Sequence, residues 1–162
     1  MTKQLKQHKL LFPILSILWV IVILSFSLQD GSRSSLQSGM ITTTIQSLLS
    51  NIGIDIERQL LSFLIRKAAH FTEFFILGVL VKQSTFDLKN TIPLYLACLV
   101  PVIDETVQSF IPGRAMAITD MFIDLSGILF GFLIMNLMHN IHRIRKERML
   151  SFCQWVVSKV YF

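Results

Sequence analysis

The chain has 162 residues, of which 52% are hydrophobic and only 15% are charged, and its mean hydropathy is +0.61. Soluble globular domains carry about 25% charged residues, so this composition excludes an ordinary soluble domain. It indicates an integral membrane protein with a single domain, residues 1–162. The net charge of +5 is concentrated next to apolar segments. This placement fits the positive-inside rule better than a nucleic-acid surface, so we expect no nucleic-acid partner.

Four apolar segments have about the 20 residues that a membrane-spanning helix needs. The first follows a basic start, as in a signal peptide. It is longer than a usual signal segment and has no small-residue cleavage pattern after it, so we expect it to be a retained span. The last contains Gly127 and Gly131, a small-xxx-small pattern that predicts close helix packing. The predicted fold is an all-α bundle of about four transmembrane helices, at residues 10–28, 60–81, 91–111 and 118–139.

Basic residues cluster near both ends of the chain, at Lys3, Lys6 and Lys9 and again at Arg143, Arg145, Lys146 and Arg148. With four spans, both clusters lie on one side, and the positive-inside rule makes that side the cytoplasm. We therefore expect a multi-pass protein of the cell membrane with both termini in the cytoplasm. The connection 82–90 would also lie inside, and residues 29–57 and 111–117 would lie outside. Residues 140–162, which are basic and aromatic, are expected to be a cytoplasmic tail on anionic lipid.

The predicted outer segment contains "GMITTTIQSLLSNIG", residues 39–53, in which apolar side chains recur at helical spacing. This pattern predicts an amphipathic helix on the outer membrane surface, ended by Asn51 and Gly53. A helix packed over the bundle as a lid is an equally open interpretation. The apolar positions are Met40, Ile41, Ile45, Leu48, Leu49 and Ile52.

Three of the four predicted spans carry charged residues, which are costly in hydrocarbon. On a helical wheel the polar residues of each span share one face, and all three faces fall in the outer half of the membrane. We predict that they meet in an outward-opening polar cluster that binds a ligand. Its five carboxylates outnumber its three fixed bases, so the cavity is expected to be acidic. The predicted cluster is Arg66, Lys67, His70, Glu73, Asp104, Glu105, Gln108, Arg114, Asp120 and Asp124.

The same cluster offers groups for chemistry, with His70 as a general acid or base. Lys67 and Arg114 are suited to a phosphate. Asp104, Glu105 and Asp120 could hold a divalent metal with His70, but no ligand spacing such as HExxH is present. We therefore expect no metal and no cofactor, and no Ser or Cys stands out as a nucleophile. The candidates for catalysis, if there is any, are His70, Glu73, Asp104 and Glu105.

Two motifs in this region resemble the VanZ-like family of small membrane proteins. They are "KAAHFTEFFILG", from Lys67, and "DETVQSFIPGRAMAITDMFIDLSGILFG", from Asp104. The segment "FSLQDGSRSSLQS" also resembles the opening of that family, and the resemblance extends over about residues 10–138. Asp124 departs from the pattern, in which Asn is expected. The resemblance implies an association with resistance to teicoplanin, a glycopeptide antibiotic with a fatty acyl tail, and it implies no mechanism.

Three functions stay open at this point. The first is a bacterial cell-envelope protein that contributes to lipoglycopeptide resistance because the polar cluster binds a head group or the antibiotic. The second is a membrane-embedded enzyme that modifies a lipid or a cell-wall precursor. The third is a structural or lipid-organising protein in which the charges pair and hold the bundle. The expected partners are membrane lipids, a lipoglycopeptide or a lipid-linked cell-wall precursor, and the residues leave the oligomeric state open.

Overall fold

The structure is a computed structural model that describes the backbone of residues 3–85 and 91–160 and the side chains of residues 10–85 and 91–156. Within these ranges it contains helices and no strand, so the predicted all-α class is confirmed. Most of the expected connection 82–90, the lysine side chains near the amino terminus and the last two residues lie outside the described part. The helices are α1 (Lys3–Ser27), α2 (Gly31–Asn51), α3 (Arg58–Ser84), α4 (Ile92–Gln108) and α5 (Ile118–Val160).

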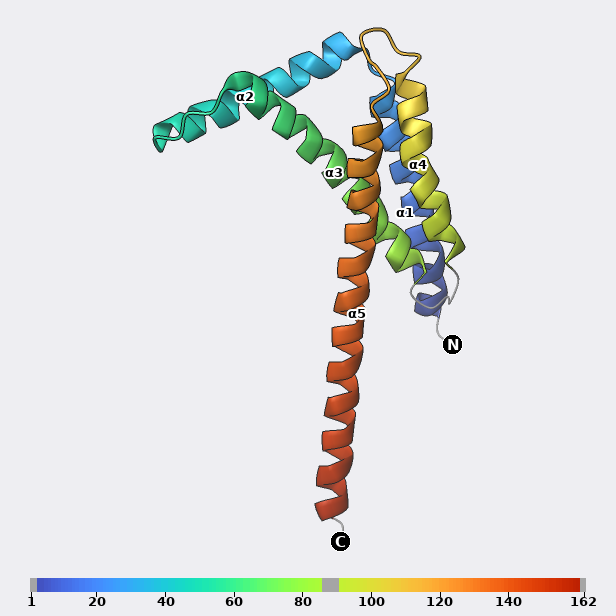
Figure 1. The fold of residues 1–162 in the computed structure, drawn as a ribbon. Helices are drawn as coiled ribbons and strands as arrows, with labels where there is room; N and C mark the ends of the chain where they lie inside the picture. The colour runs from blue at the N-terminus through green and yellow to red at the C-terminus, as the bar shows by residue number, and fades with distance from the viewer. Residues whose placement is uncertain (1–2, 86–90, 161–162) are drawn as a thin grey trace.

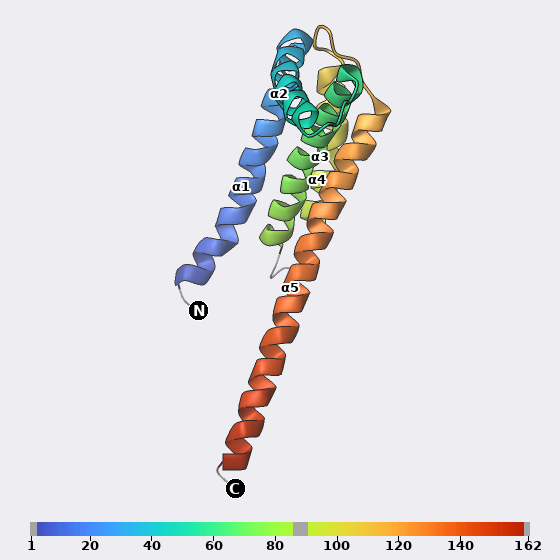
Figure 2. The same cartoon turned by 90° about the vertical axis from the view of Figure 1, so that its left-hand side faces the viewer.

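Helix α3 is the centre of the bundle, because it packs against α1, α2, α4 and α5. Figure 1 shows it crossing α5 diagonally, with α1 and α4 beside it, while α2 projects away from the bundle at one end. The turn between α4 and α5 lies at that same end. The start of α1 and the last turns of α5 lie toward the opposite end in both Figure 1 and Figure 2. Apart from α2, the helices therefore run back and forth between the two ends of the bundle.

Two helices are long and apolar enough to cross a membrane by themselves, within residues 10–27 of α1 and 118–156 of α5. The prediction of four spans is therefore supported only in part among the described residues. Helix α4 has 17 residues, or about 25 Å of helix, against a hydrocarbon core of about 30 Å. Helix α3 is long enough at 27 residues, but it carries Arg66, Lys67 and Glu73 in its middle.

The bundle exposes many large apolar side chains and buries several polar ones. Large apolar side chains are exposed along α1 and α5, for example Ile17 at 63% and Phe122 at 68%. Among the described residues eight polar side chains are buried, as many as the buried apolar ones, and three of them are Asp104, Glu105 and Asp124. Because charged groups are costly in hydrocarbon, this arrangement suits a bundle with lipid outside and polar groups inside.

Close packing of α3 against α5 depends on glycines. A Cβ atom added at Gly127 would lie 2.6 Å from the carbonyl oxygen of Phe71. At Gly131 and Gly78 an added Cβ would overlap the facing backbone still more. Real Cβ atoms essentially never come so close, so only glycine permits this approach. The structure thus places Gly127 and Gly131 in a seam between two helices, which is the role that their spacing predicts.

Helix α2 is longer than predicted. It begins at Gly31, well before the expected apolar stretch, because the Ser-rich segment continues the same helix. It ends at Asn51 as expected, and Gly53 has a φ of 78°. Its buried side chains are Ser38 and Thr42, whereas Met40, Leu48 and the other large apolar residues of the helix are mostly exposed. The apolar face is therefore not packed over the bundle, which argues against a lid formed by that face.

Helix α5 continues far past the predicted end of its span at residue 139. It has 43 residues, or about 65 Å of helix, about twice the thickness of a hydrocarbon core. Every described side chain from Asn140 to Val156 is exposed. The predicted basic and aromatic tail is thus the second half of one continuous helix, and Figure 1 shows it extending beyond the other helices.

Candidate functional site

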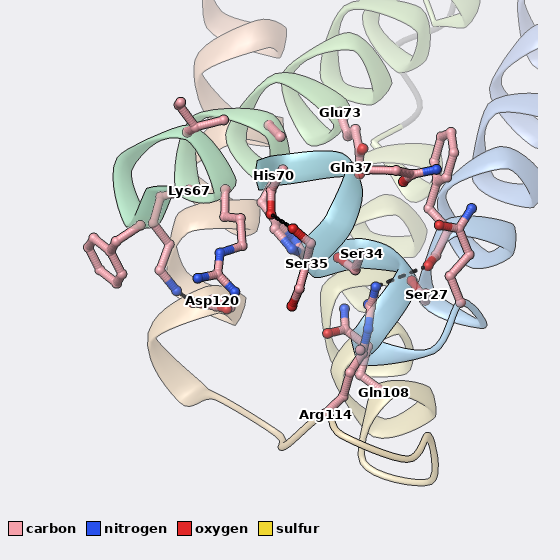
Figure 3. A pocket seen from close by; sticks show the side chains of 18 of the residues that line it. Ser27, Ser34, Ser35, Gln37, Lys67, His70, Glu73, Gln108, Arg114 and Asp120 are labelled. Atoms are coloured by element: carbon pink, nitrogen blue, oxygen red, sulfur yellow. Dashed lines mark hydrogen bonds and ion pairs between the residues drawn. The ribbon is translucent and has the colours of Figure 1, made fainter. Parts of the chain in front are cut away.

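A pocket of about 550 Å³ lies at the end of the bundle where α2 joins it. Helices α2 and α3 contribute most of its wall, and the ends of α1 and α4, the turn between α4 and α5, and the start of α5 complete it (Figure 3). Its chemistry is mixed, because serines and glutamines stand beside ionisable groups. The ionisable side chains that line it are Arg66, Lys67, His70, Glu73, Arg114 and Asp120.

An ion pair between Lys67 and Asp120 joins α3 to the start of α5 at one side of the pocket. We call this pair the pocket rim. The ammonium group of Lys67 binds the carboxylate of Asp120, and the two side chains are 21% and 16% exposed. Figure 3 shows the pair bridging α3 and the beginning of α5. Lys67 also lies 5.1 Å from the ring centroid of Phe63. Since these charges largely cancel, Arg66 and Arg114 are the bases left in the lining for an anionic group.

The turn between α4 and α5 positions Arg114. Gly113 has a φ of 75°, a conformation that favours glycine. The backbone N–H of Gly31 donates to the carbonyl oxygen of Pro112 at 3.2 Å, and a Cβ added at Gly31 would overlap the carbonyl of Gly113. The start of α2 is thus locked against this turn. Arg114 Nη2 then reaches the carbonyl oxygen of Phe26 at 3.4 Å, at the edge of the pocket.

Behind the pocket wall lies a second group of acids, the buried carboxylate layer, which consists of Asp104, Glu105 and Asp124. Asp104 is 1% exposed and accepts two hydrogen bonds, from the hydroxyl of Ser27 and from Gln108 Nε2 at 2.6 Å. The bond from Ser27 joins the end of α1 to α4, whereas Gln108 lies one turn further along α4 itself. Gln108 thus holds the carboxylate of Asp104 in place for its contact with α1.

Glu105 and Asp124 have fewer partners than Asp104, although both are 0% exposed. Glu105 Oε2 accepts a hydrogen bond from the backbone N–H of Ala117 at 2.8 Å, just before α5 begins. Glu105 Oε1 and both oxygens of Asp124 have no hydrogen-bond partner among the described residues. Asp124 Oδ1 lies 3.5 Å from His70 Nδ1, close enough for an ionic contact but too far for a good hydrogen bond.

The predicted cluster is therefore divided into two parts by the pocket wall. Seven of its ten residues line the pocket, and one of them, Gln108, also holds Asp104. The other three form the buried carboxylate layer, in which Glu105 accepts its hydrogen bond just before the start of α5. The expectation of an acidic cavity is wrong for the lining, which has three bases and two carboxylates. The reason is that the three buried acids face the helix interfaces.

Several lining residues were not predicted as site residues. Ser27 is buried, and Ser34, Ser35, Gln37 and Ser38 enter from α2. The signal for them was present as the polar run "SRSSLQS", residues 32–38, directly after the first span. Its spacing carries no chemistry of its own, because serines in a helix usually face solvent or their own backbone. Only the position of α2 brings them to the pocket.

A second, more apolar groove of about 430 Å³ adjoins the pocket between α1 and α3. Trp19 closes one side, and its indole N–H donates to the backbone carbonyl of Glu73 at 2.8 Å. The groove and the pocket share four lining residues, so the two cavities adjoin each other. The groove is lined by Trp19, Phe26, Ile65, Ala68, Ala69, Thr72, Glu73 and Ile76.

The fold and the site define a class of protein, an all-helical membrane protein with an apolar surface and a polar interior at one end. The family model described as VanZ/LLP1 matches residues 12–139, which include the pocket and the buried carboxylate layer. The chain belongs to the VanZ/LLP1 family, as its motifs predict. Comparison with curated proteins finds no match, and comparison with solved structures finds none either. The family and the two apolar helices together point to a membrane protein.

Proposed function

We propose that this chain is a multi-pass membrane protein with four spans, both termini in the cytoplasm, and a pocket that opens at the outer surface. The start of α1 and the last turns of α5 lie toward the same end of the molecule in Figures 1 and 2, which supports an even number of crossings. On α4, Leu96 and Leu99 are 59% and 55% exposed, as a lipid-facing helix requires. Burial of Asp104 and Glu105 leaves that helix with an apolar outer face. The basic residues of α5 beyond residue 139 then lie in the cytoplasm.

The pocket binds the head of an amphiphile, and the adjoining groove takes the first part of its acyl chain. The single observation that carries this proposal is that a charged pocket and an apolar groove adjoin each other and share lining residues such as Ile65 and Glu73. Ligand sites commonly combine an apolar wall with a few placed polar groups. A phospholipid, or a lipid-linked precursor of the cell wall, has both parts.

The charges of the lining favour an anionic or zwitterionic head over a cationic one. Because Asp120 is occupied by Lys67, the guanidinium groups of Arg66 and Arg114 dominate the lining. A guanidinium group donates two parallel hydrogen bonds to a phosphate. Glu73, at the junction of pocket and groove, is placed to accept a donor such as an ammonium or hydroxyl group of the head.

Binding of such an amphiphile at the outer surface is how we propose that the protein contributes to resistance to a lipoglycopeptide such as teicoplanin. The acyl tail of the antibiotic inserts among lipids at the outer surface. A protein that binds acyl-bearing molecules there either binds the antibiotic itself or changes which lipids and lipid-linked precursors the antibiotic can reach. The exposed apolar residues of α2, among them Met40 and Ile41, extend this surface next to the pocket.

The test is susceptibility of a sensitive host that expresses matched amounts of the wild type and single variants. Wild type is expected to protect against teicoplanin but not against vancomycin, which lacks the acyl tail. Arg114→Ala removes a head-group contact, and Ala68→Trp fills the groove. Both are expected to lose protection. Leu64→Trp is the matched control, because Leu64 is an exposed residue of α3 outside the pocket and the groove.

Direct binding separates this proposal from its alternatives. Purified wild type in nanodiscs is expected to retain phospholipid or lipid-linked precursor, as seen by native mass spectrometry, and Ala68→Trp is expected to retain less. Protection that is equal in all variants would contradict the proposed site and leave a structural role. Chemical conversion of the retained lipid by the purified protein would replace binding with the enzymatic alternative.

A further inference from the structure

We infer that His70, Asp104 and Asp124 form a binding site for a divalent cation behind the wall of the pocket. The residues come from α3, α4 and α5, and each offers a ligand atom within 4.8 Å of those of the other two. Three ligands of one metal ion, at bonds of about 2.0–2.2 Å, lie roughly 3.3–3.8 Å apart. A shift of these side-chain atoms by about 1 Å or less therefore completes the site. This inference does not depend on the amphiphile proposed above.

Asp124 gives a second, independent reason for a cation. Its side chain is 0% exposed, and neither carboxylate oxygen has a hydrogen-bond partner among the described residues. A buried carboxylate without partners is strongly disfavoured, because nothing replaces its lost hydration. His70 Nδ1 is also buried and lacks a hydrogen-bond partner there. A cation between these atoms satisfies the oxygens of Asp124 and the ring nitrogen together.

An ion pair between His70 and Asp124 alone does not account for this geometry. The contact of 3.5 Å involves only Oδ1 of Asp124, so Oδ2 remains without a partner. It also leaves the convergence of Asp104 on the same point unexplained. Helix packing alone does not require an acid at position 124, since the glycines of α5 make the close contact with α3.

The surroundings of Asp104 are those of an oriented metal ligand. Its two oxygens accept hydrogen bonds from Ser27 and Gln108, and each oxygen retains a second lone pair. Hydrogen bonds of this kind fix a ligating carboxylate in place and are part of most metal sites. Ser27 and Gln108 line the pocket as well, so the site adjoins it directly.

The ligand set selects the class of cation. One imidazole and two carboxylates suit Zn²⁺ or Mn²⁺ better than Mg²⁺, which prefers oxygen ligands alone. Three protein ligands leave at least one coordination position open. Because His70 lines the pocket, an anionic oxygen of a bound head group would be the natural occupant of that position.

The experiment is a metal titration of the full chain purified in detergent and stripped with a chelator, without lipid or antibiotic. Bound Zn²⁺ and Mn²⁺ are measured by mass spectrometry after gel filtration, and thermal unfolding is followed by tryptophan fluorescence. Wild type is expected to bind about one ion per chain and to unfold at a higher temperature with metal. Asp124→Asn and Asp104→Asn are each expected to weaken binding by about 100-fold or more, since loss of an outer-shell partner alone costs 10- to 100-fold.

Asp120→Asn is the matched control, because Asp120 is a carboxylate of the same helix that binds Lys67 rather than the cluster. It is expected to keep the affinity of the wild type. Equal loss in Asp120→Asn and Asp124→Asn would overturn the assignment. A folded wild type that binds no ion, and gains no thermal stability from one, would overturn it whatever the variants do. A failure of the lipid-binding experiment leaves this titration unaffected.

Discussion

Asp120 and Asp124 lie one turn apart on α5, yet they belong to different regions of the molecule. Asp120 is in the pocket rim, where it is partly exposed and bound to Lys67. Asp124 is in the buried carboxylate layer, where it is fully buried and its one ionic contact among the described residues is with His70 Nδ1 at 3.5 Å. The same residue type in the same helix thus has two roles. Asp120 neutralises the charge of Lys67 at the mouth of the pocket. Asp124 is a buried carboxylate that a positive charge inside the bundle would stabilise.

The largest expected effect is one that breaks both regions at once. Gly131→Leu would drive a side chain into the backbone of α3, so α3 and α5 could not approach, and neither the rim nor the carboxylate layer would form. Overpacking of this kind costs about 3 kcal/mol or more. The yield of monodisperse protein and its unfolding midpoint are expected to fall sharply. Gly39→Leu is the control, because a Cβ at Gly39 meets nothing within 4 Å.

The second largest effect is a difference in the free energy of unfolding between a substitution in the carboxylate layer and one in the rim. Asp104→Leu leaves the donors of Ser27 and Gln108 without an acceptor inside the bundle. We expect a loss of about 2–4 kcal/mol in the free energy of unfolding. Asp120→Leu, in the partly exposed rim, is expected to cost only about 0–1 kcal/mol. Equilibrium unfolding in mixed micelles measures both, and equal losses would contradict the distinction between rim and layer.

The contribution of one bond to the carboxylate layer is smaller again. Ser27→Ala removes one hydrogen bond to Asp104 and is expected to destabilise the protein by about 1 kcal/mol. Ser25→Ala is the matched control on the same helix, because the exposed hydroxyl of Ser25 donates to the backbone carbonyl of Val22 on α1 itself. A control that is as destabilised as Ser27→Ala would show that the layer contributes nothing through α1.

The smallest expected effect is the coupling within the rim. A double-mutant cycle with Lys67→Ala and Asp120→Ala should give about 0.2–1 kcal/mol, as partly exposed ion pairs do. The coupling should weaken further at high salt, because screening acts on charges that water can reach. A coupling that is several times larger and insensitive to salt would place this pair in the buried layer instead.

Much of the site could be predicted from the sequence. Charged residues that share one face of an apolar helix must turn away from lipid, so they face the other helices of the bundle. That reasoning correctly drew α3, α4 and α5 together around Lys67, Asp104 and Asp120. It could not divide the residues between the pocket and the layer behind it. A helical wheel shows which way a side chain points around its own helix but not how deeply that side chain is buried in the bundle. Asp104 and Asp120 have the same charge, and only the packed helices show which one water can reach.

The local sequence pattern could not predict that α2 contributes polar side chains to the pocket. Its apolar positions predicted a helix correctly, but the decisive face was the polar one with Ser34 and Ser38. Serine has no strong preference that separates a pocket wall from a solvated face. What fixes α2 is a contact distant in sequence, between Gly31 and the turn at Gly113, and a single sequence gives no way to pair those two glycines.

The length of α5 gives the molecule a mechanical property. One continuous helix runs from Asp120, at the pocket mouth, to exposed turns far beyond the other helices. The 37 residues from Asp120 to Val156 form a rod of about 54 Å, so a tilt of about 5° at the pocket displaces the far end by roughly 5 Å. Any change of shape on ligand binding that tilts the start of α5 is therefore amplified along this lever, with no hinge in between to absorb it.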